Sequence, residues 1–284
     1  MSKKTKKEIV INSGMSSIVI DSEWPTLIKS IKEDKFLYKY IPSCRISLKN
    51  TGRIDAYLSI KKGNVFRVRL DYPHVYCYQP RNADVRGLIS LAGYILERAN
   101  NEKGVYSIHA SVISKNGKAV VIFGGTTNLG KSIVAKTAAD KYGWSFYSDE
   151  TALLSGKDRE VVGGVKVASG CDRFRDFDLA EAKEKPKIRA FIHPHIDNGL
   201  NTVVKWEPVK FLWHLKEELA RKIRGGSKAI NHFNYPLDSI DTFELAKNRL
   251  TFAKKLAKQI PCYEVRGTPE SISEAINKIS RVEK

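Results

Sequence analysis

The residues with the clearest chemistry form a glycine loop from Gly125 to Ser132. They fit the pattern G-x-x-x-x-G-K-[ST] and read Gly125, Thr126, Thr127, Asn128, Leu129, Gly130, Lys131, Ser132. The backbone N–H groups of such a loop turn inward to hold phosphate, and the following helix adds the partial positive charge of its N-terminus. The pattern therefore predicts that this loop, with Ile133 after it, binds the phosphates of ATP.

Three residues at the end of the loop have individual roles in this interpretation. Lys131 is expected to reach the β- and γ-phosphates, and the Ser132 hydroxyl is expected to bind Mg²⁺. Gly130 leaves the backbone without a Cβ where phosphate approaches. The alternative is a chance match in a glycine turn.

The flanking sequence decides between these alternatives. Residues 119–123 are apolar and mostly β-branched, which predicts a strand buried on both faces. Residues 133–141 have helical spacing and good helix formers. Strand, glycine loop and helix is the order that a phosphate-binding loop requires. Residues 105–114 are also strand-like, and the Asn116-Gly117 turn predicts that they form a hairpin with the strand before the loop.

An acidic pair follows the next predicted strand, at residues 144–147. Asp149 is expected to accept the proton of the acceptor hydroxyl, because open α/β sheets place their ligands at the carboxyl ends of strands. Glu150 is expected to support Mg²⁺, directly or through water. Since neighbouring residues of a strand point to opposite sides, only one of the two should face the γ-phosphate. The alternative is a pair of solvated acids at a strand end.

Two further groups are candidates for the reaction site. His109 lies on the strand before the hairpin, although a lone histidine in a strand is more often structural. Arg173 and Arg175 lie in a charged, irregular segment. They could stabilise the transferred phosphate or hold an RNA phosphate, and the alternative is a solvated charged loop.

The chain has 284 residues, of which 42% are hydrophobic, so it is long and apolar enough for one large domain or two smaller ones. We expect a small β-rich N-terminal domain over residues 1–84, a candidate for RNA or substrate contact, and a phosphate-loop domain over residues 85–284. Strands are expected at 9–11, 17–20, 36–41, 45–49, 56–61, 65–70, 74–78, 161–168, 188–196, 203–208 and 261–265. Helices are expected at 24–31, 85–100, 211–223, 241–259 and 271–280.

The charge is unusual, because 49 basic residues face only 31 acidic ones and give a net charge of +18. This balance predicts a polyanionic partner, with nucleic acid first. A lysine-rich proteome is the alternative, but glutamate usually rises with lysine there. Basic segments at 3–7, 61–62 and 221–228 are candidates for RNA backbone contact. Phe233 and Tyr235, near the last of these, are candidates for base stacking.

Nothing in the sequence predicts secretion or a membrane span, so a cytoplasmic protein is expected. The four cysteines are far apart and form no C-x-x-C pair, which predicts buried thiols. His193 and His195 flank Pro194, and a structural role is expected for them because the sequence offers no evident third metal ligand.

Taken together, these motifs resemble the HPr kinase/phosphorylase family, whose catalytic fold is shared with phosphoenolpyruvate carboxykinase. The resemblance spans about residues 86–280 and rests on 108–111, 117–124, the loop to Ser132, 147–150 and 261–265. It implies an α/β fold with an HPr kinase/PEP carboxykinase-like P-loop core beside the small β-rich N-terminal domain. It also implies ATP and Mg²⁺ as cofactors, a place for His109 near the metal or acceptor, and a tendency to form a homo-oligomer.

The sequence departs from this family at several positions. Thr127 and Asn128 replace the usual Ser-Gly, and Glu150 replaces the second aspartate. The arginine-containing signature of the family is missing, and residues 171–175 stand where it should be. Because that signature shapes the acceptor side, the protein substrate of the family does not carry over.

The basic character and the missing signature are similar to an archaeal group of RNA kinases that phosphorylate a ribose 2′-hydroxyl in transfer RNA. This resemblance implies an ATP-dependent kinase acting on an RNA hydroxyl, with tRNA as partner. A protein serine kinase or small-molecule kinase of the same fold is the alternative, and a nucleotide-binding module without catalysis is a third hypothesis. The target nucleotide and the choice of ATP or GTP do not follow from the sequence.

Overall fold

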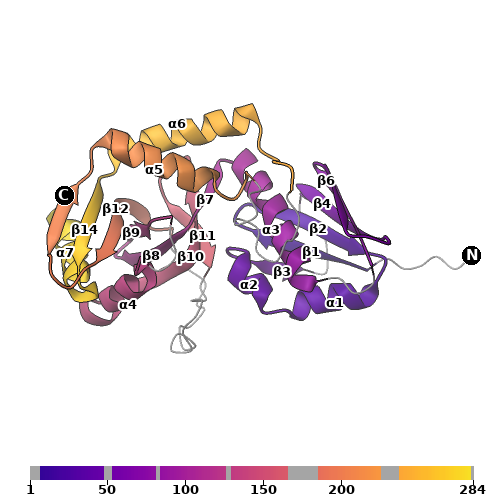
Figure 1. The fold of residues 1–284 in the computed structure, drawn as a ribbon, viewed down its shortest axis with the longest axis horizontal. Coiled ribbons are helices and arrows are strands. Elements are labelled where there is room, and N and C mark those ends of the chain that lie inside the picture. Colours follow the sequence, from indigo (N-terminus) through magenta and orange to yellow (C-terminus); the bar gives the residue numbers. More distant parts are fainter. Residues whose placement is uncertain are drawn as a thin grey trace, which may run out of the picture. The chain divides into compact units, whose positions relative to one another are not determined.

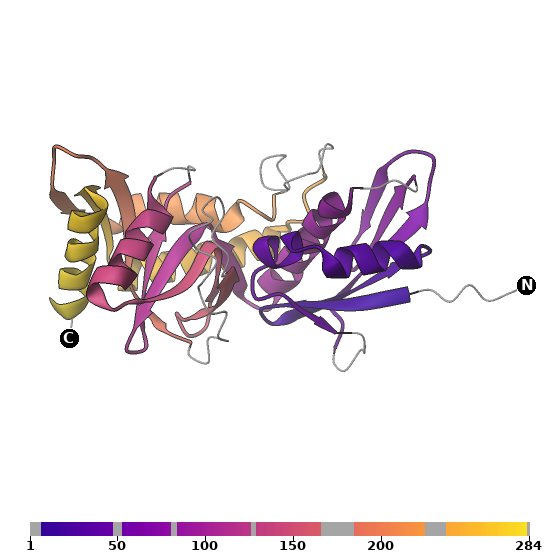
Figure 2. The ribbon, with the colours of Figure 1, turned by 90° about the horizontal axis from the view of Figure 1, so that it is seen from below.

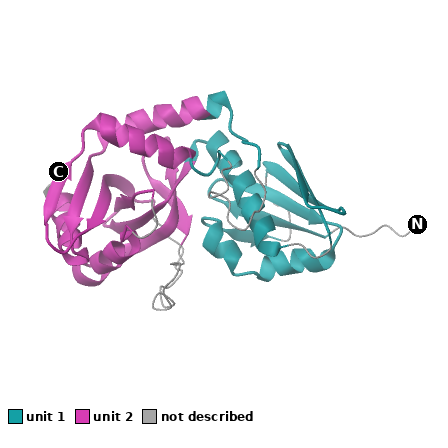
Figure 3. Ribbon diagram, in the orientation of Figure 1, with its two compact units in different colours: residues 1–105, 221–245 teal, residues 106–220, 246–284 magenta. Residues whose placement is uncertain are grey.

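The computed structural model describes residues 7–47, 53–80, 84–125, 129–165, 185–224 and 237–282. The chain divides into two compact units (Figure 3). Unit 1 contains Met1–Val105 and Arg221–Leu245, and unit 2 contains Tyr106–Ala220 and Ala246–Lys284. Each unit is built on a mixed sheet, so the predicted α/β class is confirmed.

Unit 1 contains a six-stranded sheet in the order β3-β1-β2-β4-β6-β5. Its strands are β1 (Lys7–Ser13), β2 (Ser16–Ser22), β3 (Arg45–Ser47), β4 (Ala56–Lys62), β5 (Arg67–Asp71) and β6 (His74–Gln79). The β2–β4 and β4–β6 pairs are parallel, and the other neighbours are antiparallel. Side chains of β4 and β6 alternate between buried and partly exposed, as expected for strands with one covered face.

Three helices cover one face of this sheet (Figures 1 and 2). They are α1 (Pro25–Glu33), α2 (Phe36–Tyr40) and α3 (Val85–Glu102). Their apolar side chains pack on the inward-facing residues of the strands. The shared core contains Ile9, Ile11, Ile18, Ile20, Ile31, Leu37, Leu58, Ile60, Leu88 and Ile95.

Two features of unit 1 differ from the expectation. The strand predicted at 36–41 is wrong, because Phe36–Tyr40 is a helix. The Asp34 carboxylate accepts from the backbone N–H of Phe36 (2.8 Å), and Leu37 and Tyr40, three residues apart, bury one helical face. Moreover, α3 and the distant segment 221–245 belong to unit 1, whereas the sequence placed the boundary at residue 84.

Unit 2 contains an eight-stranded sheet in the order β11-β10-β8-β9-β12-β14-β13, with β7 paired to β10. Its strands are β7 (Val105–Ile108), β8 (Ala110–Lys115), β9 (Lys118–Phe123), β10 (Ser145–Ser155), β11 (Val161–Val165), β12 (Lys187–Ile196), β13 (Thr202–Lys205) and β14 (Cys262–Gly267). The predicted hairpin is confirmed, because β8 and β9 are antiparallel around the Asn116-Gly117 turn. Strands β9, β12 and β14 are parallel.

Helices cover both faces of the second sheet (Figures 1 and 2). They are α4 (Lys131–Tyr142), α5 (Pro208–Ala220), α6 (Phe243–Gln259) and α7 (Pro269–Val282). Helices α4 and α7 share one core with the sheet, and α5 and α6 share the other. Unit 2 is therefore a three-layer α/β/α arrangement, and β9 lies in its middle with every residue from Ala119 to Phe123 buried.

Candidate functional site

The predicted strand, loop and helix follow each other directly as β9, residues 124–130 and α4. Gly130 is the N-cap of α4 and has a left-handed φ of 81°. A Cβ on Gly130 would lie 2.5 Å from Cγ1 of Ile196, so both backbone conformation and space favour glycine. Thr126, Thr127 and Asn128 lie outside the described residues.

The two other predicted loop positions lie on either side of the helix start. Leu129 Cδ1 lies 2.5 Å from the place where a Cβ on Gly124 would stand, so it packs on the beginning of the loop. The Ile133 side chain is exposed in the first turn of α4. Both therefore border the loop, and any contact with phosphate would come from their backbone.

Lys131 is buried at the start of α4, with only 8% of its surface exposed. Its Nζ donates to the carbonyl oxygen of Gly124 at 3.1 Å. The ammonium group therefore bonds the first residue after β9, where the loop begins. A buried cation at this position is suited to binding an anion held by the loop.

Asp149 contacts the first turn of the same helix. The Ser132 hydroxyl donates to its carboxylate, at 2.9 Å from Oδ1 and 3.0 Å from Oδ2. The Ser111 hydroxyl of β8 also donates to Oδ1. Asp149 is 1% exposed, and this burial raises the pKa of its carboxyl, while the bonds from Ser111 and Ser132 oppose the rise. Two of the predicted site residues, Asp149 and Ser132, are thus brought together.

An irregularity in β10 places Asp149 on this side of the sheet. The register between β10 and β8 shifts between Phe146 and Ser148, which adds one residue to β10. After the shift Ser148 pairs with Val112, and Asp149 comes beside Ser111 on the α4 face. The expectation that Asp149 ends its strand is wrong, because β10 continues to Ser155. The extra residue, rather than the strand end, directs its side chain.

Glu150 and His109 form a second pair. Glu150 has a φ of 63°, which is uncommon for a residue other than glycine, and the ladder to β11 is irregular there. Nδ1–H of His109 donates to the carbonyl oxygen of Glu150 at 2.7 Å, and a Glu150 carboxylate oxygen lies 3.6 Å from the same nitrogen. Both side chains are partly exposed. Asp149 therefore contacts Ser132, whereas the Glu150 carboxylate lies beside His109.

Glu218 is a site residue that the sequence reasoning missed. It is 9% exposed on α5, and its Oε1 lies 2.7 Å from the position that a Cβ on Gly125 would occupy. Its spacing contained a signal, because Phe211, Leu215 and Leu219 form the buried stripe of α5 and Glu218 lies within that stripe. A carboxylate on an apolar helix face that reaches a glycine loop is a candidate to position the loop or its ligand.

His193 and His195 belong to an aromatic cluster at the end of β12. The ring centroid of His193 lies 5.6 Å from that of His195, 5.9 Å from that of His214 and 5.0 Å from that of Trp206. Burial, with the neighbouring histidines, lowers the pKa of His193 to about 4, so this imidazole is neutral at physiological pH. The cluster contains a third histidine that the sequence did not indicate. Nevertheless, no group of three or more metal-ligating side chains forms within the described residues.

The remaining predicted contacts are only partly described. Arg173 and Arg175 lie outside the described residues, as do Lys228, Phe233 and Tyr235. Lys222 lies 5.1 Å from the centroid of the Tyr40 ring, and burial lowers its pKa. Lys222 therefore packs within unit 1 and is not a freely solvated cation.

Comparisons with known proteins add no identification. No protein-family model matches the chain, and a search of curated proteins finds no relative. Among the helices of the described segments, none is both long and apolar enough to cross a membrane.

Proposed function

We propose that the protein is an ATP-dependent kinase that transfers the γ-phosphate to a hydroxyl of RNA. The resemblance noted above suggests a ribose 2′-hydroxyl of tRNA as the acceptor. The observation that carries the proposal is the contact between Ser132 and Asp149, beside the buried ammonium of Lys131, at the end of β9. A hydroxyl, a carboxylate and an ammonium next to a glycine loop are the groups that phosphoryl transfer uses.

The donor side fits Mg-ATP. The Ser132 hydroxyl is a hard oxygen ligand, which Mg²⁺ prefers, and this residue would hold the metal. When bound, Mg²⁺ supplies charge neutralisation at the phosphates. Lys131 and the N-terminus of α4 contribute further positive charge at the same point. These residues hold and orient the nucleotide so that the γ-phosphate faces the acceptor.

Asp149 is the candidate proton acceptor on the acceptor side. Its burial raises its pKa, and a raised pKa makes a carboxylate a better base near neutral pH. The two serine hydroxyls fix the orientation of the carboxylate. Glu150 lies on the strand that carries Asp149, and His109 directly precedes β8, which carries Ser111. The partial exposure of this pair suits contact with an incoming acceptor.

Charge favours RNA over a protein or a small molecule as the acceptor. A net charge of +18 would repel basic substrates and attract a polyanion over its whole surface. A kinase acting on a small molecule has no comparable need for this excess. We keep a protein serine kinase or small-molecule kinase as the alternative outcome of the test.

The test is transfer of label from γ-phosphate-labelled ATP to total RNA and total protein in parallel reactions. We expect label in a tRNA-sized band that resists removal of terminal phosphates. Lys131→Ala should abolish the transfer, because the variant loses the cation at the loop. Lys136→Ala is the matched control, since Lys136 lies on the same helix but pairs with Asp140 at an exposed position.

Three other results would contradict the proposal. Label in protein or only in small molecules would replace the RNA acceptor with the alternative. Transfer that survives Lys131→Ala would remove the loop from the mechanism. Binding of ATP without its consumption, unchanged in Asp149→Asn, would indicate a nucleotide-binding module without catalysis.

A further inference from the structure

Aromatic and basic side chains share the face of the unit 1 sheet opposite to α1, α2 and α3. The inward residues of β4 and β6, such as Leu58 and Val75, belong to the core beneath the helices. Their neighbours point to the other face because side chains alternate along a strand. The pairing aligns Tyr57 with His74, Ser59 with Tyr76 and Lys61 with Tyr78. On the other side of β6, the pairing aligns Asp71 with His74, Arg69 with Tyr76 and Arg67 with Tyr78.

The rings of this face are available for stacking. The Tyr57 and His74 rings are nearly parallel, with centroids 4.9 Å apart and planes inclined by 7°. Tyr57, Tyr76 and Tyr78 are partly exposed, and His74 is exposed. In a sheet whose apolar residues face the helices, a row of tyrosines on the other face adds little to the core and leaves flat, accessible π-surfaces.

Cations lie over and beside these rings. Lys61 Nζ is 4.5 Å from the centroid of Tyr76, and the Arg69 guanidinium is 5.9 Å from the same centroid. Arg67 is exposed next to Tyr78, and no acidic side chain pairs with it within the described residues. Glu8 and Asp21 lie on β1 and β2 of the same face, and Asp71 on β5 forms an ion pair with Arg69. The basic and aromatic character is therefore confined to β4, β6 and β5.

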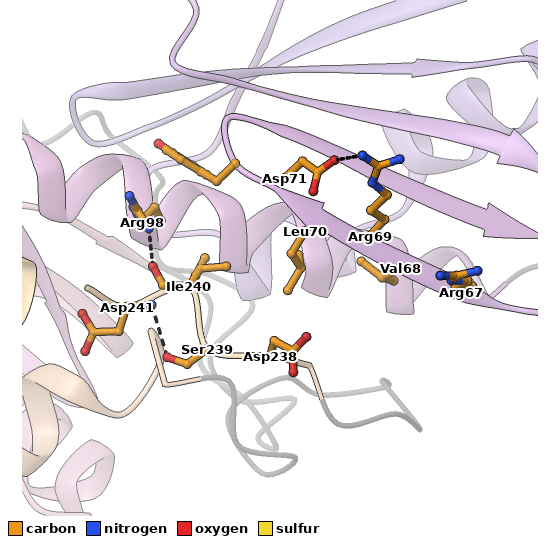
Figure 4. Close-up of a pocket in the computed structure, with 11 residues that line it drawn as sticks. Arg67, Val68, Arg69, Leu70, Asp71, Arg98, Asp238, Ser239, Ile240 and Asp241 are labelled. Atoms are coloured by element: carbon orange, nitrogen blue, oxygen red, sulfur yellow. Dashed lines mark hydrogen bonds and ion pairs between the residues drawn. The ribbon is translucent and has the colours of Figure 1, made fainter. Parts of the chain in front are cut away.

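A cavity of about 420 Å³ lies along the edge strand β5 and helps to define where a polyanion could lie (Figure 4). Arg67 and Arg69 line it from β5, whereas Asp238 and Asp241 line it from the segment before α6. Arg98, which also lines the cavity, bonds Glu102 and the carbonyl oxygen of Ile240. The acidic side chains disfavour phosphate inside this cavity, so the arginines are better placed to hold phosphate on the tyrosine side of β5.

From this arrangement we infer that the face formed by Tyr57, Tyr76, Tyr78, Lys61, Arg67 and Arg69 binds single-stranded RNA. Unpaired bases stack on the tyrosines, and Lys61 and the two arginines contact the phosphates between them. A duplex keeps its bases stacked inside and cannot use the rings, so single strands or tRNA loops are preferred. The inference deepens the proposed function, on which it rests for the identity of the substrate, because it names the surface that holds the acceptor RNA.

The experiment is equilibrium binding, by fluorescence anisotropy, of a labelled oligo(U) of about 12 nucleotides and of a duplex RNA of the same length. We expect the full-length protein to bind the single strand more tightly. Tyr76→Ala and Tyr78→Ala should each weaken this binding roughly 5-fold to 100-fold, which is the effect of losing one stacked base. Tyr76→Phe should restore most of the affinity, since it keeps the ring.

Matched control variants distinguish loss of binding at this face from loss of non-specific charge attraction and from unfolding. Tyr38→Ala removes an exposed tyrosine from α2, on the covered side of the sheet, and should leave binding unchanged. Arg67→Ala should reduce the slope of log affinity against log salt by about 1, whereas Lys29→Ala on α1 should not. The thermal unfolding of each variant, measured in parallel, shows whether a loss of binding comes from unfolding.

The outcomes distinguish this inference from the kinase proposal. Unchanged binding in Tyr76→Ala and Tyr78→Ala, equal loss in Tyr38→Ala, or equal affinity for duplex and single strand would overturn the inference. If tRNA is still phosphorylated in that case, the proposed function stands without it. If oligo(U) binds as expected but no RNA is phosphorylated, the face is retained and the kinase proposal fails.

Discussion

The position of Asp149 illustrates how one added residue in a strand can create a site. Strict alternation from Phe146 would direct residue 149 away from α4, and the shift in the β10–β8 register reverses this. The motif therefore predicted a carboxylate near the loop without predicting the mechanism that puts it there. A bulge depends on the pairing of distant strands, which local sequence patterns do not report.

Removing the charge of Asp149 should affect phosphate transfer and the stability of the fold in opposite directions at neutral pH. Because burial raises its folded pKa, the folded state holds the proton more tightly than the unfolded state, so stability falls as pH rises through this pKa. We expect Asp149→Asn to be more stable than the wild type to urea at about pH 7, and the difference to vanish near pH 3. Phosphate transfer should fall about 10²-fold to 10⁴-fold, as for loss of a general base.

The dependence of phosphate transfer on the Mg²⁺ concentration tests whether Asp149 acts as the base or as a metal ligand. If Asp149 acts as the base, Asp149→Asn lowers kcat and leaves the Mg²⁺ concentration for half-maximal activity unchanged. Ser132→Ala is the control that should raise this concentration, because it removes the hydroxyl expected to bind the metal. Phosphate transfer that persists in folded Asp149→Asn would show that Asp149 has only a structural role.

At the scale of elements, the turn from β9 into α4 depends on a glycine with a left-handed backbone. Gly130 has a φ of 81°, and an L-residue in this region costs about 1–2 kcal/mol. We expect Gly130→Ala to destabilise unit 2 by roughly this amount and to weaken ATP binding, because the added Cβ meets Ile196 and displaces the start of α4. Urea unfolding and calorimetric titration with ATP measure the two effects.

The other end of α4 offers a control with the same backbone strain. Gly143 is the C-cap of the helix with a φ of 67°, and among the described residues a Cβ there would meet only Lys115 Nζ, at 3.7 Å. Gly143→Ala should lower stability by a similar amount and leave ATP binding intact. Equal loss of ATP binding in both variants would mean that strain anywhere in α4, and not the geometry of the loop, controls the site.

Elements whose apolar residues follow a regular spacing, and whose ends are marked by turn residues or glycine, could be predicted from the sequence. The buried run 119–123 between a turn and a glycine gave β9, and the spacing of 85–100 gave α3. The run 36–41 gave the wrong element, because its aromatic residues favour strands and its helix is fixed by tertiary burial of Leu37 and Tyr40. Similarly, the strand expected over 105–114 is interrupted at His109, where the imidazole bonds Glu150 from another strand.

At the scale of the whole molecule, unit 1 is completed by a segment more than a hundred residues away along the chain. Ile223, Ile240 and Leu245 belong to the same core as α3. The Tyr94 hydroxyl is 129 residues from Ile223, whose carbonyl it contacts at 3.1 Å. No local pattern predicts such pairing, which is why the sequence placed the boundary at residue 84 and assigned α3 to the second domain.

Tyr94 therefore provides a test of what holds residues 237–245 against α3 in unit 1. Its hydroxyl contacts the carbonyl oxygens of Ile223 and Asp238 and accepts from the backbone N–H of Ile240 at 2.9 Å. Tyr94→Phe leaves these buried backbone groups without that partner and should cost about 1–3 kcal/mol in the free energy of unfolding. Hydrogen exchange should rise in residues 237–245, since the lost bonds hold this segment to α3.

Tyr147→Phe is the matched control, because Tyr147 is also buried and its hydroxyl donates to the carbonyl oxygen of Val161 in unit 2 at 3.2 Å. It should cost less and leave exchange in residues 237–245 unchanged. If Tyr94→Phe is no more destabilising than Tyr147→Phe and residues 237–245 stay protected, apolar packing of Ile223, Ile240 and Leu245 alone closes the unit. In that case the hydroxyl network only selects the register of a segment that the core already holds.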